Sequence, residues 1–156
     1  MDHKHYMQEA VTAALKGMQN NEGGPFGCVI VKDGKIIGKG NNKVTSTNDP
    51  TAHAEVTAIR DACKNLGSFQ LEGCILYTSC EPCPMCLGAI YWARPEKVYY
   101  GSTKTDAAHI GFDDDFIYEE LKLPYADRSI PFEQLAPEVA ITPFQEWAVK
   151  EDKTEY

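Results

Sequence analysis

Three cysteines at intervals of three residues constrain this chain more than any other feature of its sequence. They are Cys80, Cys83 and Cys86, in the stretch "TSCEPCPMCLGAI". Pro84 is favourable at the first position of a helix, so we expect Cys83 at the helix cap and Cys86 in the first turn. The partial positive charge at a helix N-terminus favours thiolates, the form in which cysteine binds a metal. The pattern therefore indicates a metal site at the start of this helix.

A second stretch, "NDPTAHAEVTAIR", predicts a helix over residues 50–66. Asp49 is typical of an N-cap and Pro50 of the first helical position. An apolar face follows at helical spacing, made up of Ile59, Ala62 and Leu66. At about 100° per residue, Glu55 falls at the centre of this face and His53 falls on the other side of the helix.

Near the end of a helix, side chains that diverge on the helical wheel can still reach one point beyond it. If the two predicted helices aim their N-termini at one spot, His53, Cys83 and Cys86 can share a tetrahedral zinc. Glu55 would then face the site from the buried side, where a divalent cation and its bound water compensate its charge. Taken singly, each group has an ordinary explanation: a solvated histidine, a redox-active or coincidental CxxC pair, or a carboxylate paired with a lysine.

The number of protein ligands decides what such a zinc ion does. With His53, Cys80, Cys83 and Cys86 all bound, the site is closed and structural. With three ligands, a fourth position stays open for water, whose pKa zinc lowers to about 7. We expect the open site with one zinc per chain, because Cys80 ends an apolar strand and is suited to burial as a small hydrophobe. The buried Glu55 favours the same choice, since a hydrolytic zinc needs a carboxylate beside it.

The rest of the chain indicates one α/β domain of 156 residues. Alternation of strands and helices predicts an α/β sandwich containing some parallel strands. The expected elements are a helix over 5–19, a hairpin over 28–40 with an Asp-Gly turn, strands at 74–79 and 97–101, a helix at 84–94, and short helices within 112–121 and 143–151.

Composition and charge exclude several classes of protein. No run approaches the ~20 apolar residues of a membrane span, and the start lacks the apolar run of a secretory signal. We therefore expect a cytoplasmic protein with reduced thiols, a disulfide framework for the six cysteines being the alternative. The net charge of −8 argues against a protein that grips a long polyanion, so we expect neither a nucleic-acid nor a membrane partner.

The order His-Ala-Glu and then Pro-Cys-Pro-Met-Cys resembles the zinc-dependent cytidine and deoxycytidylate deaminase-like family of nucleobase and nucleoside deaminases. The likeness also takes in "GGPFG", "LYTSCEPCPMC" and "AIYWAR" in the first two thirds of the chain. It implies a cytidine-deaminase-like α/β/α sandwich, a five-stranded mixed sheet with helices on both faces. It also implies zinc on His53, Cys83 and Cys86, with Glu55 carrying protons between water, a ring nitrogen and the leaving ammonia.

Within that family, the chain is similar to the purine-acting branch, and its "GFDD" stretch and "EY" end are similar to the members that act on guanine. The resemblance implies hydrolysis of free guanine to xanthine and ammonia. The substrate-binding residues that it implies are Phe26, Asn42, Ala54, Trp92, Asp114 and Tyr156.

Each of these residues is expected to contact the substrate in its own way, and most of them also have an ordinary structural explanation. Asp114 would accept the donors of guanine, or else belong to a solvated run that caps a helix. Asn42 would donate and accept at another edge of the purine, or else simply occupy a turn. Phe26 and Trp92 would sandwich the ring, or else belong to the core. Tyr156 would close an active site from a C-terminal segment, about residues 120–156, which packs on or exchanges with the partner in a homodimer.

Three alternatives to a guanine-specific enzyme remain open at this point. A tRNA adenosine deaminase would have to hold a polyanion, against which the acidic balance argues. A cytosine-type deaminase would use the same zinc chemistry on another base. A zinc interaction module without turnover would bind its metal through Cys80 as a fourth ligand, and would have no use for a buried Glu55.

Overall fold

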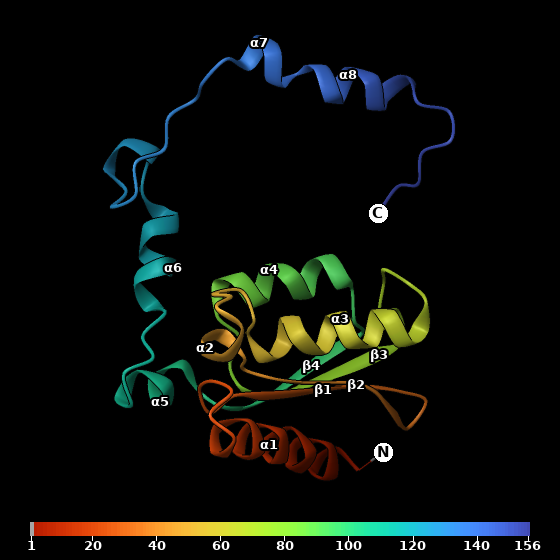
Figure 1. The fold of residues 1–156 in the computed structure, drawn as a ribbon, viewed down its shortest axis with the longest axis vertical. Helices are drawn as coiled ribbons and strands as arrows, with labels where there is room; N and C mark the ends of the chain where they lie inside the picture. Colours follow the sequence, from red (N-terminus) through yellow and green to blue (C-terminus); the bar gives the residue numbers. More distant parts are fainter. Residues whose placement is uncertain (1) are drawn as a thin grey trace. The chain divides into compact units, whose positions relative to one another are not determined.

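The structure is a computed structural model that describes residues 2–156, and its chain divides into two compact units (Figure 1). The first unit ends at Asp115 and the second runs from Phe116 to Tyr156. The first unit is built on a mixed sheet of strand order β2-β1-β3-β4. The strands are β1 (Gly27–Lys32), β2 (Lys35–Asn41), β3 (Cys74–Cys80) and β4 (Lys97–Ser102). β1 is antiparallel to both neighbours, whereas β3 and β4 are parallel.

Helices cover both faces of this sheet, as expected for an α/β/α sandwich (Figure 1). Helix α1 (His3–Gln19) packs on one face, and α3 (Ala54–Leu66) and α4 (Pro84–Ala93) lie on the other. The expected fold class is confirmed, but the expected count of five strands is wrong: the described residues form four. After β4 the chain enters α5 (Lys104–His109) and then an aspartate run, and aspartate disfavours a further strand.

The alternation of side chains along the strands produces two apolar layers. On β1, Val29 and Val31 pack with α1, whereas Cys28 and Ile30 pack with α3 and α4. The layer beneath α3 contains Ala54, Ala58 and Ala62, whose small side chains let the helix lie close to the sheet. Gly40 on β2 makes this approach possible, because a Cβ there would lie 2.3 Å from the backbone oxygen of Ala54. This close contact sets how near α3 lies to β2.

Helix α3 begins four residues later than the sequence predicted. The Asp49 carboxylate does not cap it; it accepts the backbone N–H and the hydroxyl of Thr51 at 2.8 and 2.6 Å. The residues around Pro50 therefore form a turn, and His53 is the N-cap, with extended backbone angles of φ −70° and ψ 158°. Local signals could not distinguish the two starts, because an aspartate followed by proline is typical both of a helix N-terminus and of a turn.

The remaining elements are short helices. They are α2 (Val44–Thr47), α6 (Asp115–Lys122), the 3-10 helix η1 (Tyr125–Asp127), α7 (Pro137–Ala140) and α8 (Thr142–Val149). The two short helices predicted near the C-terminus correspond to α6 and α8. No helix in the described part of the chain has the length and apolarity needed to cross a membrane. All six cysteines are free thiols, so the alternative of a disulfide framework is not what the structure contains.

Candidate metal centre

The structure brings His53, Cys83 and Cys86 together at one point of the first unit. The His53 Nδ1 atom lies 3.5 Å from the Cys83 sulfur and 3.4 Å from the Cys86 sulfur. The three ligand atoms all lie within 4.8 Å of one another. Among the described residues, these three side chains are the cluster that could hold a metal ion. One histidine and two cysteines are a donor set that zinc prefers.

The spacing of these atoms fits a tetrahedral zinc ion. With Zn–S bonds of about 2.3 Å and Zn–N bonds of about 2.0–2.1 Å at tetrahedral angles, a nitrogen and a sulfur ligand lie about 3.6 Å apart. The observed N–S distances of 3.4 and 3.5 Å agree with that value. Because both sulfurs face Nδ1, this nitrogen is the one that would bind the metal.

The N-terminal ends of two helices, α3 and α4, supply the three ligands. His53 caps α3 and Cys83 caps α4, each in an extended conformation and each without a side-chain bond to its own helix. Cys86 lies in the first turn of α4, behind Pro84 at the first helical position. The extended backbone at His53 explains how this ring reaches the same centre as Glu55, which the helical wheel had placed on the opposite side of the helix.

The surroundings of the two thiols shift their pKa values in opposite directions. A hydrogen bond from the Cys86 thiol lowers the pKa of Cys83 to about 4, and the neighbouring His53 lowers it further. The pKa of Cys86 is raised, first because its proton serves that hydrogen bond and then because of burial. The hydrogen bond to the Cys83 sulfur raises the pKa of His53. Zinc binds thiolates, so its binding displaces the proton of Cys86.

Glu55 lies beside this centre and is only 6% exposed. The single thiol proton of Cys86 faces both the Cys83 sulfur and Glu55 Oε2, which lies 3.3 Å from the Cys86 sulfur, and Glu55 Oε1 accepts from the Thr78 hydroxyl at 3.0 Å. Burial raises the pKa of the Glu55 carboxyl, and the two hydrogen bonds oppose that rise. A buried carboxyl group of raised pKa next to a metal site is suited to taking up and releasing protons.

Cys80 lies apart from the three ligands. It ends β3, is 8% exposed, and its thiol faces the backbone oxygen of Thr103 at 3.6 Å. Burial, its largest influence, raises the pKa of this thiol to about 11. A thiol that keeps its proton and points to a carbonyl group is a small buried side chain, in agreement with the open, three-ligand site.

Asn42, Ala54 and Phe26 all belong to the first unit, and their substrate contacts stay predictions. Ala54 follows His53 directly and is fully buried. Asn42 follows β2 and is 6% exposed; its Oδ1 accepts from the backbone N–H groups of Gly24 and Val44 at 3.2 and 3.1 Å. With the oxygen so engaged, the Asn42 amide is oriented to offer its NH₂ group as a donor.

Asp114, Trp92 and Tyr156 have different positions. Asp114 is half-buried, and its charge contributes to the raised pKa of His53, so it lies near the centre. Trp92 is 64% exposed and lies six residues beyond Cys86, about 9 Å along the helix, so the single chain does not bring it to the centre. Tyr156 belongs to the second unit. Their substrate contacts stay predictions.

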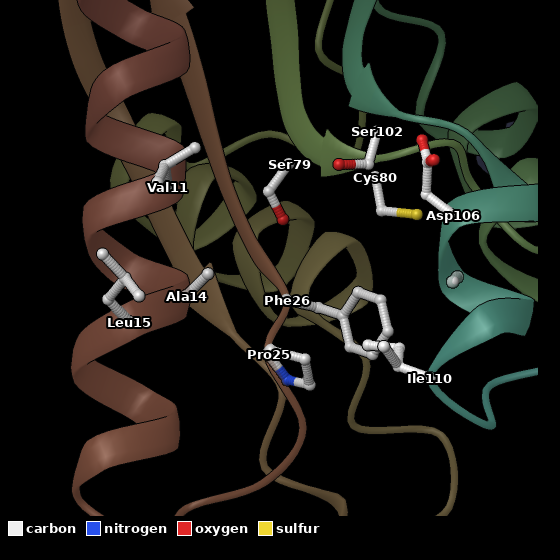
Figure 2. Close-up of a pocket in the computed structure, with 11 residues that line it drawn as sticks. Val11, Ala14, Leu15, Pro25, Phe26, Ser79, Cys80, Ser102, Asp106 and Ile110 are labelled. Carbon is white, nitrogen blue, oxygen red and sulfur yellow. The ribbon is translucent and has the colours of Figure 1, made fainter.

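A cavity of about 250 Å³ lies between α1, α5 and the sheet, and Phe26 is among the residues that line it (Figure 2). Two of its polar groups already serve the fold, since the Ser79 hydroxyl accepts from the Gly27 N–H and the Asp106 carboxylate accepts from the Thr103 N–H. None of the three metal-ligating side chains lines it. A base requires convergent free donors and acceptors, so we place the functional site at the metal centre and not here.

Thr78 is the site residue that the sequence analysis missed. It lies in β3, within an apolar run, and reaches Glu55 across the space between the sheet and α3. The available signal was the alternation of side chains along the strand. Thr78 follows Cys74 and Leu76 at intervals of two, and both of these face the layer under α3 and α4.

Comparison with known proteins agrees with this geometry. The family model for the cytidine and deoxycytidylate deaminase zinc-binding region matches residues 1–102. The guanine deaminase of Bacillus subtilis is 60% identical over 156 residues, which is the full length of both chains. Its X-ray structure superposes with a TM-score of 0.97, covering 100% of this chain and 99% of that one. The tRNA-specific adenosine deaminase of Aquifex aeolicus is 42% identical over 102 residues, 65% of this chain and 67% of its own.

The chain belongs to the cytidine and deoxycytidylate deaminase family with a zinc-binding region. The prediction of zinc as the metal is thereby confirmed, and His53, Cys83 and Cys86 are the residues whose geometry fits one ion per chain.

Proposed function

We propose that this protein is a zinc hydrolase that deaminates free guanine to xanthine and ammonia. The observation that carries the proposal is the 60% identity with the Bacillus subtilis guanine deaminase across the whole of both chains. The family model ends at residue 102, and the Aquifex aeolicus match covers 65% of the chain. The C-terminal third therefore resembles the guanine deaminase beyond the region that both kinds of relative share.

The reaction joins the oxygen of water to C2 of guanine and breaks the bond from C2 to the exocyclic amine. When bound, zinc supplies a Lewis acid that lets water lose a proton near neutral pH. Glu55 takes this proton on Oε2, the oxygen that faces the metal centre, and passes it to the ring nitrogen beside C2. It then delivers the second proton of the water to the departing amine, so that ammonia leaves and xanthine remains.

The proposed base-binding groups complement the edges of guanine. The NH₂ group of Asn42 donates to an acceptor of the purine, because its carbonyl oxygen already serves Gly24 and Val44. Asp114 accepts from N1–H and the exocyclic amine, and Phe26 packs on the ring. Ala54 forms part of the floor beside Glu55. Buried groups placed in this way reject a base that leaves them unpaired.

A substrate panel tests the proposed activity. We expect ammonia release from guanine with kcat/KM at least about a hundredfold above that for adenine, cytosine, their nucleosides or a tRNA anticodon stem-loop, because only guanine pairs all the site's polar groups. The assay is a coupled ammonia measurement at two salt concentrations. Preference for the stem-loop, with rates that fall steeply as salt rises, would instead assign the chain to the tRNA adenosine deaminases.

We also propose that the enzyme is a cytoplasmic homodimer whose C-terminal segments exchange. The second unit has no core of its own, because none of its residues is buried within it although it carries many apolar side chains. Helix α4 of the first unit likewise exposes Leu87, Tyr91 and Trp92. Apolar surface of this extent marks a protein interface. The exposed large side chains of the second unit include Phe116, Ile130, Leu135, Val139, Phe144 and Trp147.

Shortening the chain tests the role of this segment. A chain ending at Lys150 keeps α8 and lacks Tyr156, and we expect its kcat/KM to fall by about tenfold to a hundredfold because the site is less well closed. Circular dichroism should show an intact fold. Mixing this chain with Glu55→Gln protein, which is impaired but has the full segment, should restore activity if the segment acts on the partner. An unchanged rate in the shortened chain would exclude Tyr156 from the site.

A further inference from the structure

We infer that Thr78 is a positioning residue, which aims the Glu55 carboxylate at the reacting centre through one hydrogen bond. Its hydroxyl donates to Glu55 Oε1 at 3.0 Å, from the middle of the sheet. The inference rests on the proposed role of Glu55 as the proton carrier. Among the described residues no hydrogen bond joins the Thr78 side chain to His53, Cys83 or Cys86, so Thr78 acts on the reaction through Glu55.

A threonine is costly at this position unless its hydroxyl has a partner. Thr78 is 1% exposed, and its strand neighbour Tyr77 and the next residue on its own face, Leu76, are fully buried. A buried hydroxyl without a hydrogen bond is destabilising, and a valine would fill the same space without that cost. The Thr78 hydroxyl donates its hydrogen bond to Glu55, and this contact joins the sheet to the first turn of α3.

The two carboxylate oxygens of Glu55 have different hydrogen-bond partners. Oε1 is held by Thr78, while Oε2 faces Cys86 at 3.3 Å. Zinc binds Cys86 as a thiolate, which has no proton to donate, so the bond from Cys86 is lost when the metal is present. Thr78 then remains as the side-chain donor to Glu55 among the described residues.

This single donor matters because a carboxylate rotates readily about its last torsion. The terminal torsion of a glutamate has broad, shallow energy wells, so packing alone does not fix the plane of the carboxylate. A bond at Oε1 holds the plane so that Oε2 stays directed at the metal centre. Proton transfer requires a base within hydrogen-bond reach of the proton, so a rotated carboxylate slows the chemical step and leaves substrate binding intact.

The test compares donor-free and donor-retaining variants. Thr78→Val keeps the shape of the side chain and removes the donor, and we expect kcat to fall by about tenfold to a hundredfold, with KM within about twofold of wild type. Thr78→Ser keeps the donor and loses a methyl group, and it should recover most of the rate. Zinc content should stay at one per chain in both, and the absorption spectrum of the cobalt-substituted protein should be unchanged.

Several outcomes would overturn the inference. They are wild-type kcat in Thr78→Val, loss of zinc in that variant, or equal losses in Thr78→Val and Thr78→Ser, which would indicate a packing role alone. Thr78→Ala is the second donor-free variant if valine prevents folding, and it is judged against Thr78→Ser in the same way. If the substrate panel identifies another base, the comparison is made with that base, so failure of the guanine assignment and failure of the positioning role give different results.

Discussion

Glu55→Gln protein is expected to hold one zinc per chain and to deaminate guanine at least about a hundredfold more slowly than wild type, since general acid–base catalysis contributes about 10²–10⁴-fold. Glutamine has the shape of glutamate, and its amide oxygen can still accept the Thr78 hydroxyl that now bonds Oε1. It cannot take up a proton, so neither transfer to the ring nor transfer to the amine can proceed through it. The measurements are steady-state kinetics and zinc content on the same preparation.

Glu81→Gln provides the matched control for this substitution. Glu81 lies between Cys80 and Cys83, and its Oε2 accepts from the backbone N–H of Lys104, at the start of α5. A glutamine oxygen can make the same bond, so we expect the rate to be unchanged. Full activity in Glu55→Gln would remove Glu55 from the mechanism. Loss of zinc in that variant would show that the carboxylate supports the metal site itself.

Where local signals decide the structure, the sequence was sufficient to predict it. The Asp-Gly pair predicted the β1–β2 hairpin because both residues must adopt positive φ, and they do so with values of 49° for Asp33 and 75° for Gly34. Pro84 likewise predicted the start of α4, with Cys83 as its cap. The convergence of His53 with Cys83 and Cys86 could be predicted because the sequence places all three near helix N-termini, from which side chains can reach one point.

Where the structure depends on contacts distant in sequence, the prediction failed or stopped. The sequence predicts the start of α3 at Pro50, but Asp49 closes a turn with Thr51 and the helix begins at Ala54. A fifth strand was inferred from the resemblance alone, and no local signal in the aspartate run supported it. Thr78 was missed because its partner lies 23 residues away in the chain, on another layer of the fold.

The pair Cys83→Ala and Cys80→Ala should give opposite results for zinc. Cys83→Ala should lose nearly all bound zinc and all activity, because it leaves two protein ligands of the three that face one another. Cys80→Ala should keep close to one zinc per chain, because its thiol faces the Thr103 carbonyl and lies outside the metal group. The measurement is metal content by mass spectrometry after dialysis against a weak chelator.

This comparison decides between an enzyme and a structural zinc module, because both readings share the same motif and differ in one sulfur. Three ligands leave a coordination position where water can be activated, and four leave none. The buried carboxylate of Glu55 has a chemical use only in the first case, because only an open position would hold a water from which Glu55 can take a proton. Loss of zinc from Cys80→Ala protein would mean that the fourth position belongs to Cys80, and the deaminase mechanism would then have no place to bind its water.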